Sequence, residues 1–291
     1  MTSAGSTAHS KVFRSGALRG RVVLVTGGGT GLGRASALEL VRCGAHVFIS
    51  GRRREVLEGA ALQITDDARA RGRVGAVAGD IRDPADAERM VATVMEEHGR
   101  LDVLVNNAGG QYFVPAEAIA AKGWQAVWRL NFEGTVNMTE AAVEGAMRAH
   151  GGGTIINVTF SPHHGLPGMT HSGSARAAVE AWTRAQAREW MGLGITLVAV
   201  AAGHFETEAI AKYPEAVRAG AGRSVPVGRL GRPEEHAWLV ALLCSSLGRA
   251  LNGSVVTLDG ARDNWFGPWP PADLLGDGGD VPTEERRGAS G

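Results

Sequence analysis

The sequence is poor in the features that mark secreted, membrane-spanning and nucleic-acid-binding proteins. Its 291 residues include two cysteines, Cys43 and Cys244, each in an apolar helical context, so we expect reduced core side chains and neither a disulfide nor a metal pair. No apolar run approaches the length that spans a bilayer. Thirty basic and thirty acidic side chains give a formal net charge of zero, so neither nucleic acid nor a membrane surface is expected as a partner.

The two ends of the chain differ in composition from its middle. Residues 1–17 mix Ser, Ala, Gly and basic residues and lack the apolar segment of a secretory signal, so we expect a disordered arm and a cytoplasmic location. Residues 262–291 begin with an aromatic, proline-rich segment and end in a Gly, Asp and Glu-rich stretch that is expected to be disordered. By length alone the chain could form one large α/β domain or two small ones, and residues 18–261 are its middle part.

A glycine-rich turn between residues 27 and 33 organises the first half of this domain. The apolar run 22–25 precedes it and predicts a buried strand, and apolar residues at helical spacing follow it from Ala35 to Val41. Glycines here allow a sharp turn and let a pyrophosphate approach the N–H groups at the start of the helix. A glycine-rich turn without a ligand is the alternative, but the strand-turn-helix context favours dinucleotide binding. The expected phosphate-binding residues are Gly27, Thr30, Gly31, Leu32 and Gly33.

Three consecutive arginines follow the second predicted strand, residues 46–50. In nucleotide-binding folds the tip of this strand meets the adenosine ribose, where an acidic side chain accepts from the 2′-hydroxyl and an arginine pairs with a 2′-phosphate. Arg52 and Arg53 therefore favour NADPH over NADH, since guanidinium groups bind phosphate in a bidentate way. A solvated basic start of the next helix is the alternative interpretation.

Two further predicted strands end in polar residues. Residues 74–81 place Asp80 and Ile81 at a carboxyl end, where an adenine ring would pack. Residues 101–105 form another strand and run into Asn-Asn-Ala-Gly at residues 106–109. A helix with charged faces is expected over residues 55–70, between the second and third strands.

The order and spacing of these motifs resemble the short-chain dehydrogenase/reductase family. The resemblance covers about residues 18 to 261 and includes Asn131, an Asn-Gly pair at 252–253 and an Asp-Gly pair at 259–260. It implies one dinucleotide-binding catalytic domain, a Rossmann doubly wound α/β sheet of seven parallel strands with helices on both faces, and a homodimer or homotetramer. It also implies cofactor-binding roles for Asn107, Ala108, Gly109, Arg176, Gly203 and Thr207.

The expected catalytic centre departs from that family. The usual set is Asn, Ser, Tyr and Lys, with Tyr and Lys four residues apart, and the resemblance places Ser172 at the Tyr position and Arg176 at the Lys position. The chain has only two tyrosines, Tyr112 and Tyr213, and neither has a basic residue four positions later. A serine hydroxyl is a much weaker acid than a phenol, whose pKa is about 10, and an arginine stays protonated. Carbonyl reduction by the family's usual route is therefore disfavoured.

Reduction of an activated C=C bond makes a different demand on the site. Hydride adds to Cβ of an α,β-unsaturated thioester, and the enolate oxygen needs hydrogen-bond donors rather than full protonation. Asn131, Ser172 and Arg176 are the expected donors. The segment 106–124 resembles the trans-2-enoyl-CoA and 2,4-dienoyl-CoA reductase branch, and residues 171–176 are most similar to the peroxisomal trans-2-enoyl-CoA reductases, which also lack the Tyr. The separate catalytic tyrosine of the dienoyl reductases would fall at Ser161.

The sequence leaves the proton donor open. Thr159 lies in the segment that corresponds to the family's Ser. His163 titrates in a suitable range, although a loop histidine without a role is the alternative. Tyr112 follows the Asn-Asn-Ala-Gly turn and is either a phenol near the cofactor or a packing residue. No carboxylate completes a recognisable metal-binding spacing with the histidines, so no metal is expected.

These residues together predict an NADPH-dependent reductase of an activated C=C bond, with a small-molecule 2-enoyl thioester on CoA or a carrier protein as the substrate. A carbonyl reductase of the same family that uses Tyr112 or a histidine as its acid is one alternative. A non-redox protein, a cyclase or an isomerase on the same fold is the other, because a fold does not determine a function.

Overall fold

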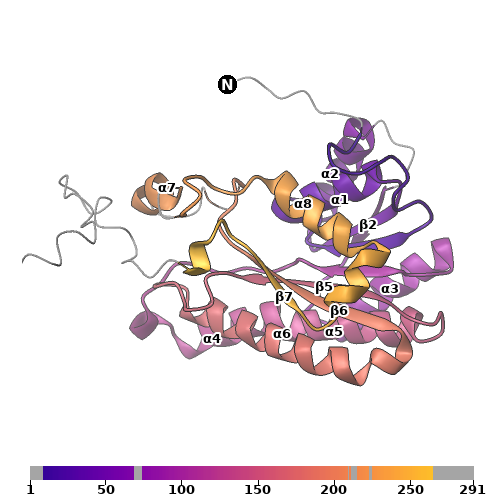
Figure 1. The fold of residues 1–291 in the computed structure, drawn as a ribbon. Helices are drawn as coiled ribbons and strands as arrows, with labels where there is room; N and C mark the ends of the chain where they lie inside the picture. The colour runs from indigo at the N-terminus through magenta and orange to yellow at the C-terminus, as the bar shows by residue number, and fades with distance from the viewer. Residues whose placement is uncertain (1–8, 69–73, 209, 211–214, 223–224, 265–291) are drawn as a thin grey trace, which may run out of the picture.

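Seven short apolar strands lie side by side in one parallel sheet with the order β3-β2-β1-β4-β5-β6-β7 (Figure 1). The structure is a computed structural model, and it describes residues 9–68, 74–208, 210, 215–222 and 225–264. The strands are β1 (Val22–Thr26), β2 (His46–Gly51), β3 (Val74–Ala78), β4 (Val103–Asn106), β5 (Gly153–Phe160), β6 (Ile195–Ala202) and β7 (Val255–Leu258). The helices are α1 (Gly31–Arg42), α2 (Arg54–Asp67), α3 (Pro84–His98), α4 (Ala121–Trp128), α5 (Gly134–Ala142), α6 (Thr170–Glu189), α7 (Glu215–Ala221) and α8 (Pro233–Leu243). The predicted doubly wound sheet is thus confirmed.

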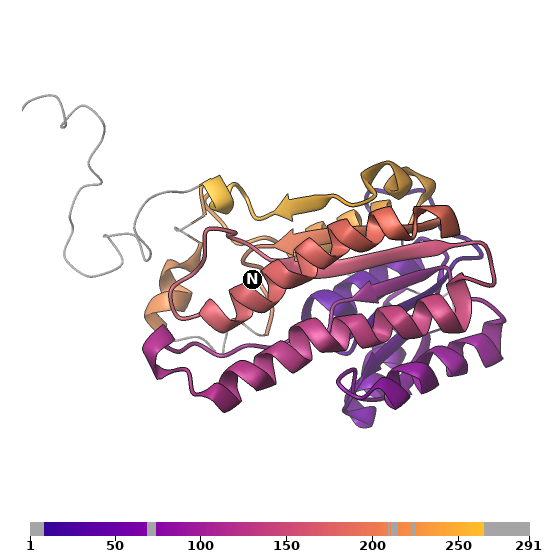
Figure 2. The same ribbon diagram turned by 90° about the horizontal axis from the view of Figure 1, so that it is seen from below.

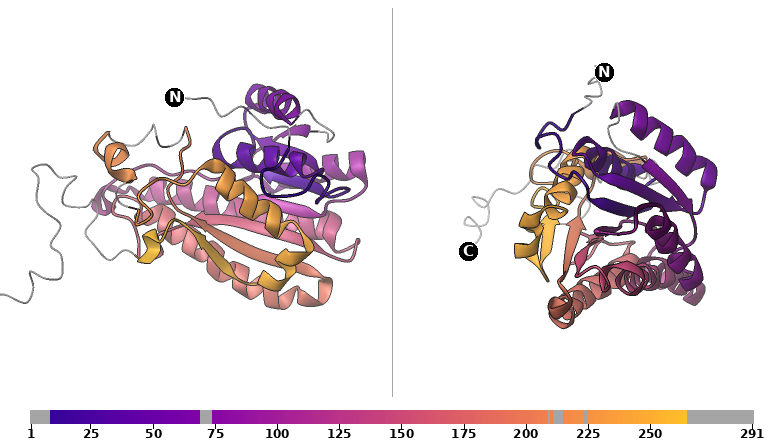
Figure 3. Two further views of the ribbon diagram at one scale, coloured as in Figure 1. Left: turned by 45° about the horizontal axis from the view of Figure 1, so that its top comes forward. Right: turned by 90° about the vertical axis from the view of Figure 1, so that its right-hand side faces the viewer.

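Alternate residues of the central strands point to opposite faces of the sheet. In β1, Val23 and Val25 pack into a cluster with residues of α1, α2 and α8, while Val22 and Leu24 pack with residues of α3 and α5. Both sets are buried, so the strand is continuously apolar, as expected for a parallel sheet covered on both sides. The view along the sheet shows the two helical layers with the strands between them (Figure 3).

Buried amides and hydroxyls tie the two central strands to the helices behind them. Asn106 of β4 donates from Nδ2 to Asn157 of β5 and to the hydroxyl of Thr139, both at 2.9 Å. Asn157 in turn donates to the hydroxyl of Thr183 on α6 at 2.9 Å. Because these groups are buried and bonded to one another, they set how α5 and α6 sit against the carboxyl ends of the strands.

Two long helical segments lie together on one face of the sheet (Figure 2). One is α6, and the other runs from α4 through a π-helical turn, Arg129–Glu133, into α5. A π-helical turn inside a long helix is uncommon and often occurs at functional sites. This turn contains Asn131, one of the expected catalytic residues.

Several element boundaries differ from the expectation. The strand predicted over 101–105 spans Val103–Asn106. The residue before it, Asp102, is also tied to β1, since its side chain accepts a hydrogen bond from the N–H of Val22 at 2.8 Å. The third strand ends at Ala78, and the N–H of Asp80 donates to Asp86 at 2.8 Å. The helix expected over 55–70 spans Arg54–Asp67.

The start of the described chain packs on the α1 side of the sheet. Leu18 is buried in the cluster there, and the hydroxyl of Ser10 donates to Glu39 of α1 at 2.5 Å. The arm expected to be disordered, residues 1–17, and the tail, 262–291, extend beyond the described residues. Cys43 and Cys244 are both buried, and neither forms a disulfide. Within the described ranges, no helix combines the length and the apolar character needed to cross a membrane.

Candidate active site

The glycine-rich turn after β1 is held against the turn after β4. The hydroxyl of Thr26 accepts from the N–H groups of Asn107 and Ala108, both at 3.0 Å, and Asn107 donates from Nδ2 to the carbonyl of Thr26 at 2.9 Å. Gly27 has a φ of +65°, and a Cβ there would lie 2.9 Å from the Cα of Ala108. A Cβ at Gly33 would lie 2.4 Å from the carbonyl oxygen of Gly27. Glycine is therefore required at both positions.

Helix α1 begins directly after this turn, at Gly31. Thr30 is the N-cap residue in extended conformation, and its own side chain makes no capping hydrogen bond. Gly31 has a φ of +53°, and the nearest side chain to a Cβ there would be Thr207 at 3.8 Å. The loop after β6 thus brings Thr207 to the predicted phosphate-binding turn. A cradle of uncapped N–H groups and glycines fits the pyrophosphate of a dinucleotide.

The loop after β2 carries two exposed arginines near Asp80. Arg52 and Arg53 lie between β2 and α2 and are solvent-exposed. The carboxylate of Asp80 accepts from Nε of Arg82 at 2.9 Å, and this bond, with a smaller contribution from the charge of Arg52, lowers the pKa of Asp80. Ile81 is buried, and a Cβ at Gly134 of α5 would lie 2.7 Å from its Cδ1. The adenine-binding roles of Asp80 and Ile81 stay predictions.

The backbone at Gly203 closely approaches the end of β7. A Cβ at Gly203 would lie 2.5 Å from the Cβ of Asp259, so the loop after β6 must carry a glycine there. The N–H of Gly203 donates to the carbonyl of Leu258 at 3.1 Å. This contact fixes where the loop that carries Thr207 leaves the sheet.

Asn131 is completely buried in the π-helical turn. Its Nδ2 donates to the carbonyl oxygens of Gly110 at 2.8 Å and Val127 at 2.9 Å, and its Oδ1 accepts from the N–H of Gly110 at 3.1 Å. The side chain therefore bonds both backbone groups of Gly110 and positions the turn that follows β4.

Arg176 lies next to Asn131, across Gly109. A Cβ at Gly109 would lie 1.9 Å from Nη2 of Arg176 and 2.7 Å from Oδ1 of Asn131. Nη1 of Arg176 donates to the carbonyl of Val158 in β5 at 2.6 Å. Burial lowers the pKa of Arg176 to about 10, so the guanidinium remains positively charged at neutral pH. The site thus contains a buried cation within reach of the Asn-Asn-Ala-Gly turn.

Ser172 lies on α6, four residues before Arg176, and contacts the same segment after β4. It is fully buried, and its hydroxyl donates to Oε1 of Gln111 at 3.1 Å. Three consecutive residues of this turn therefore contact the three side chains. Gly109 packs against Arg176, Gly110 bonds to Asn131, and Gln111 bonds to Ser172. The structure brings together the three residues that the sequence predicted as donors to the enolate oxygen, and their catalytic roles stay predictions.

Tyr112 and His171 pack against each other at one side of this cluster. Their rings meet edge to face at 4.6 Å, and burial lowers the pKa of His171. A Cβ at Gly123 of α4 would lie 2.1 Å from the hydroxyl of Tyr112, so this phenol abuts α4. A packing role for Tyr112 is consistent with both contacts.

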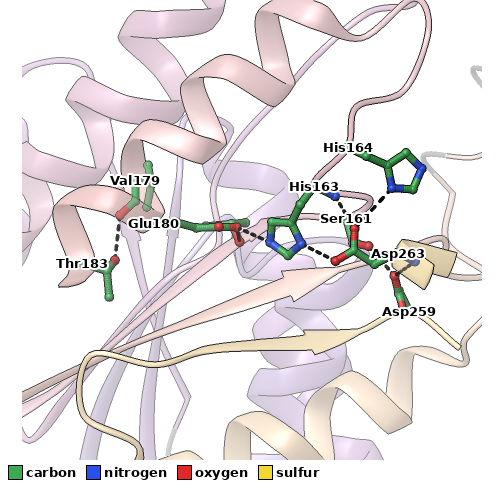
Figure 4. A network of polar contacts seen from close by, with 9 residues as sticks. Ser161, His163, His164, Val179, Glu180, Thr183, Asp259 and Asp263 are labelled. Atoms are coloured by element: carbon green, nitrogen blue, oxygen red, sulfur yellow. Dashed lines mark hydrogen bonds and ion pairs between the residues drawn. The ribbon is translucent and has the colours of Figure 1, made fainter. Parts of the chain in front are cut away.

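A chain of polar contacts starts from Thr159, the residue after Val158, and continues through Glu180 and His163 to Asp263. Figure 4 shows Glu180, His163 and Asp263 in line. The hydroxyl of Thr159 donates to Oε1 of Glu180 on α6 at 2.7 Å, and the same oxygen lies 3.1 Å from Nε2 of His163. Nδ1 of His163 lies 2.6 Å from Oδ2 of Asp263, a residue after β7. Partial burial lowers the pKa of His163, but the bonds and charges of Asp263 and Glu180 outweigh it and raise the net pKa.

Sequence reasoning did not identify Glu180 and Asp263 as part of the site. Glu180 lies four residues after Arg176 and eight after Ser172, and this spacing on one helix face is a signal that could have found it. Asp263 lies 100 residues from His163. Only the tertiary structure brings this pair together. Within the described ranges, no group of three or more His, Cys, Asp or Glu side chains is arranged to hold a metal ion.

Comparison with known proteins gives a consistent result. Residues 27–261 match the family model described as enoyl-(acyl carrier protein) reductase. The chain is 36% identical over 255 residues to a probable 2,4-dienoyl-CoA reductase of Bacillus subtilis, covering 86% of this chain and 98% of that protein. It is 32% identical over 244 residues to the 3-oxoacyl-[acyl-carrier-protein] reductase FabG of Thermotoga maritima, covering 84% and 98%.

Solved structures agree with these sequence matches. The citronellol catabolism dehydrogenase AtuB of Pseudomonas aeruginosa superimposes with a TM-score of 0.77 at 36% identity, covering 87% of this chain and 98% of that one. The relatives include the dienoyl-CoA reductase branch that the segment 106–124 resembles. The extent of these matches, together with the sheet order and the glycine turn, shows that the chain is an oxidoreductase of the short-chain dehydrogenase/reductase family.

Proposed function

We propose that this protein is an NADPH-dependent reductase of the C=C bond of a 2-enoyl thioester carried on CoA or a carrier protein. The observation that best supports this proposal is the pair Ser172 and Arg176. They lie at the centre of the cluster, at the positions where the family resemblance places Tyr and Lys. This pair offers a hydroxyl and a buried cation but no phenol. Such a set suits an oxygen that must be stabilised rather than fully protonated.

Different residues would bind the cofactor and stabilise the enolate. The glycine turn and the N-terminus of α1 would hold the pyrophosphate, and Arg176 the nicotinamide ribose. The bound reduced nicotinamide supplies the hydride that adds to Cβ of the substrate. Ser172 and the charge of Arg176 would then stabilise the negative charge on the thioester oxygen, while Asn131 keeps the turn after β4 in place.

The preference for NADPH rests on the arginines after β2. Arg52 and Arg53 are exposed at the tip of the strand where the 2′-phosphate of NADPH would lie. A guanidinium pairs with a phosphate through two hydrogen bonds, whereas the hydroxyl of NADH offers it no charge. The substrate class is supported by the relatives named for reactions on CoA and acyl carrier protein thioesters.

Two aromatic side chains on α4 and the following π-helical turn support a homo-oligomer. Trp128 is 36% exposed, and its ring lies 4.8 Å from that of Phe132. Exposed aromatic surface of this kind commonly marks a protein contact. Light scattering would measure the oligomeric state, and we expect a dimer or tetramer that Trp128→Glu weakens.

The test of the activity is the consumption of NADPH at saturating cofactor with a panel of 2-enoyl thioesters beside matched ketones. Consumption with the enoyl thioesters alone is the expected result. Consumption with ketones alone would contradict the proposal and favour a carbonyl reductase with an unusual acid. A flat trace across the whole panel would favour a family member without redox activity.

A further inference from the structure

The reduction of a 2-enoyl thioester also consumes a proton, and the usual tyrosine is missing from this site. We propose that His163, held between Glu180 and Asp263, supplies this proton through Glu180 and the hydroxyl of Thr159. The inference rests on the proposed function, because it names the proton source for that same reaction.

Both ring nitrogens of His163 face carboxylate oxygens. Nδ1 lies 2.6 Å from Oδ2 of Asp263, and Nε2 lies 3.1 Å from Oε1 of Glu180. A neutral imidazole has only one N–H and would leave one nitrogen lone pair facing a carboxylate oxygen. Two charge-assisted hydrogen bonds form only when both nitrogens carry a proton. The geometry therefore favours the imidazolium form of His163.

Asp263 is itself fixed in place. The N–H of His163 donates to Oδ1 of Asp263 at 2.6 Å, and the N–H of Asp263 donates to Oδ2 of Asp259 at 2.7 Å. Asp259 also accepts from the hydroxyl of Ser161. Asp263 thus holds both the backbone and the ring of His163, and it cannot rotate away without losing both bonds.

Glu180 connects the histidine to the site. One oxygen of its buried carboxylate receives both the hydroxyl of Thr159, at 2.7 Å, and Nε2 of His163, at 3.1 Å. Thr159 directly follows Val158, whose carbonyl holds Arg176. The inner end of the chain is therefore one residue along β5 from the carbonyl that binds the buried cation, and His163, with 34% of its side chain exposed, forms the outer end.

The proton balance of the step is simple. After the hydride has added to Cβ, Cα of the enolate takes the hydroxyl proton of Thr159, and Thr159 recovers a proton from Glu180. Glu180 takes its proton from Nε2 of His163, which becomes neutral. The exposed imidazole then regains a proton from water, so each turnover consumes one hydride and one proton.

The charged and titratable groups around His163 come from three parts of the chain. Glu180 faces it from α6, and Asp263 faces it from the segment after β7. His164 lies beside it, with Nδ1 3.7 Å from Oδ1 of Asp263, and Asp259 acts through its bond to the backbone of Asp263. Two facing carboxylates keep His163 protonated to a higher pH than an isolated histidine.

The first test needs neither cofactor nor substrate. NMR of the ¹⁵N-labelled imidazoles in the full chain should show both nitrogens of His163 protonated at neutral pH, with a titration midpoint above the ordinary value of a histidine. Asp263→Asn should lower the midpoint of His163, because it removes one carboxylate. A neutral His163 at pH 7, or a midpoint that Asp263→Asn leaves unchanged, would overturn the proposal.

The second test is kinetic. His163→Gln and Glu180→Gln should lower kcat for an enoyl thioester by on the order of 10²-fold at neutral pH, as loss of an acid does, with KM little changed. The wild-type rate should fall on the basic side of the pH profile, and His163→Gln should remove this limb. Thr159→Val should act like His163→Gln, and Thr159→Ser should restore the rate. His150→Gln, at an exposed histidine before β5, is the control and should keep the wild-type profile.

The two proposals fail in different ways. An active enoyl reductase whose pH profile is the same with and without His163 would overturn the proton relay alone. A wild-type protein that reduces no enoyl thioester would overturn the proposed function and, with it, the role of the relay in that reaction.

Discussion

The guanidinium of Arg176 packs directly against Gly109, where an added Cβ would lie 1.9 Å from Nη2. Arg176 comes from α6 and Gly109 from the turn after β4, so this contact joins two segments that the sequence predicts to bind the cofactor. No side chain other than hydrogen fits between them.

Gly109→Ala should displace the guanidinium and lower both the rate and the affinity for the cofactor. Because removal of one positioned donor costs about 10²- to 10³-fold in kcat, we expect a loss of at least 10²-fold. Gly173→Ala is the matched control, since a Cβ on this α6 glycine meets nothing within 4 Å. Circular dichroism and fluorescence titration with NADPH would check both variants. A Gly109→Ala protein with wild-type kinetics would remove Arg176 from the site.

Ser172→Ala should slow hydride transfer with little change in cofactor affinity. The hydroxyl now donates to Gln111, so its loss removes a donor from the turn without emptying a large volume. The expected decrease in kcat is on the order of 10²-fold. Ser174→Ala, two residues along α6 at an exposed position, should behave as the wild type in single-turnover kinetics. Equal rates for the two variants would exclude Ser172 from the mechanism.

Arg52→Ala and Arg53→Ala should weaken NADPH much more than NADH. A bond from a charged donor contributes about 1.5–3 kcal/mol, so we expect the ratio of the two dissociation constants to change by about tenfold or more. Arg54→Ala is the control, because Arg54 is exposed in the first turn of α2 and lies 3.8 Å from Glu58. Calorimetric titration with both cofactors would measure the ratio. An unchanged ratio in both variants would assign the preference elsewhere.

His236 should make the protein less stable as the pH falls. It is fully buried between α1 and α8, and burial lowers its pKa to about 4, below the unfolded value of about 6.5. The unfolded chain binds the proton first, so the free energy of unfolding should decrease between about pH 6.5 and pH 4, by up to roughly 3 kcal/mol. Above about pH 6.5 the contribution is complete.

Urea unfolding at a series of pH values would measure this effect. His236→Gln should flatten part of the slope, and the rest should remain, because burial also lowers the pKa of His204 to about 4. His150→Gln is the control, since His150 is partly exposed and bonds the carbonyl of Ala146 at 2.8 Å. A slope that His236→Gln leaves unchanged would show that the histidine is not buried in its neutral form.

Ser172 and Arg176 could be proposed as site residues from the sequence because their relative placement depends on spacing alone. Ser172 and Arg176 are four residues apart, so their presence on one helix face follows from helical geometry. Glu180 lies on the same helix face, four residues after Arg176, so the same spacing indicates it as a further site residue. The neighbours of Ile81 could not be predicted in this way. Its side chain packs against Gly134 of α5, a contact between segments far apart in the chain, and its role in adenine binding stays a prediction.

The sequence by itself determined the strand-turn-helix unit, the covered parallel sheet and the family, and it predicts Ser172 and Arg176 at the positions of the family's Tyr and Lys. These features depend on apolar periodicity and on residues close together in the chain. Only the tertiary structure placed Asp263 on His163, and Gly109 between Arg176 and Asn131. Such contacts join segments from different strand ends, and they form only when the sheet order brings those ends to one edge.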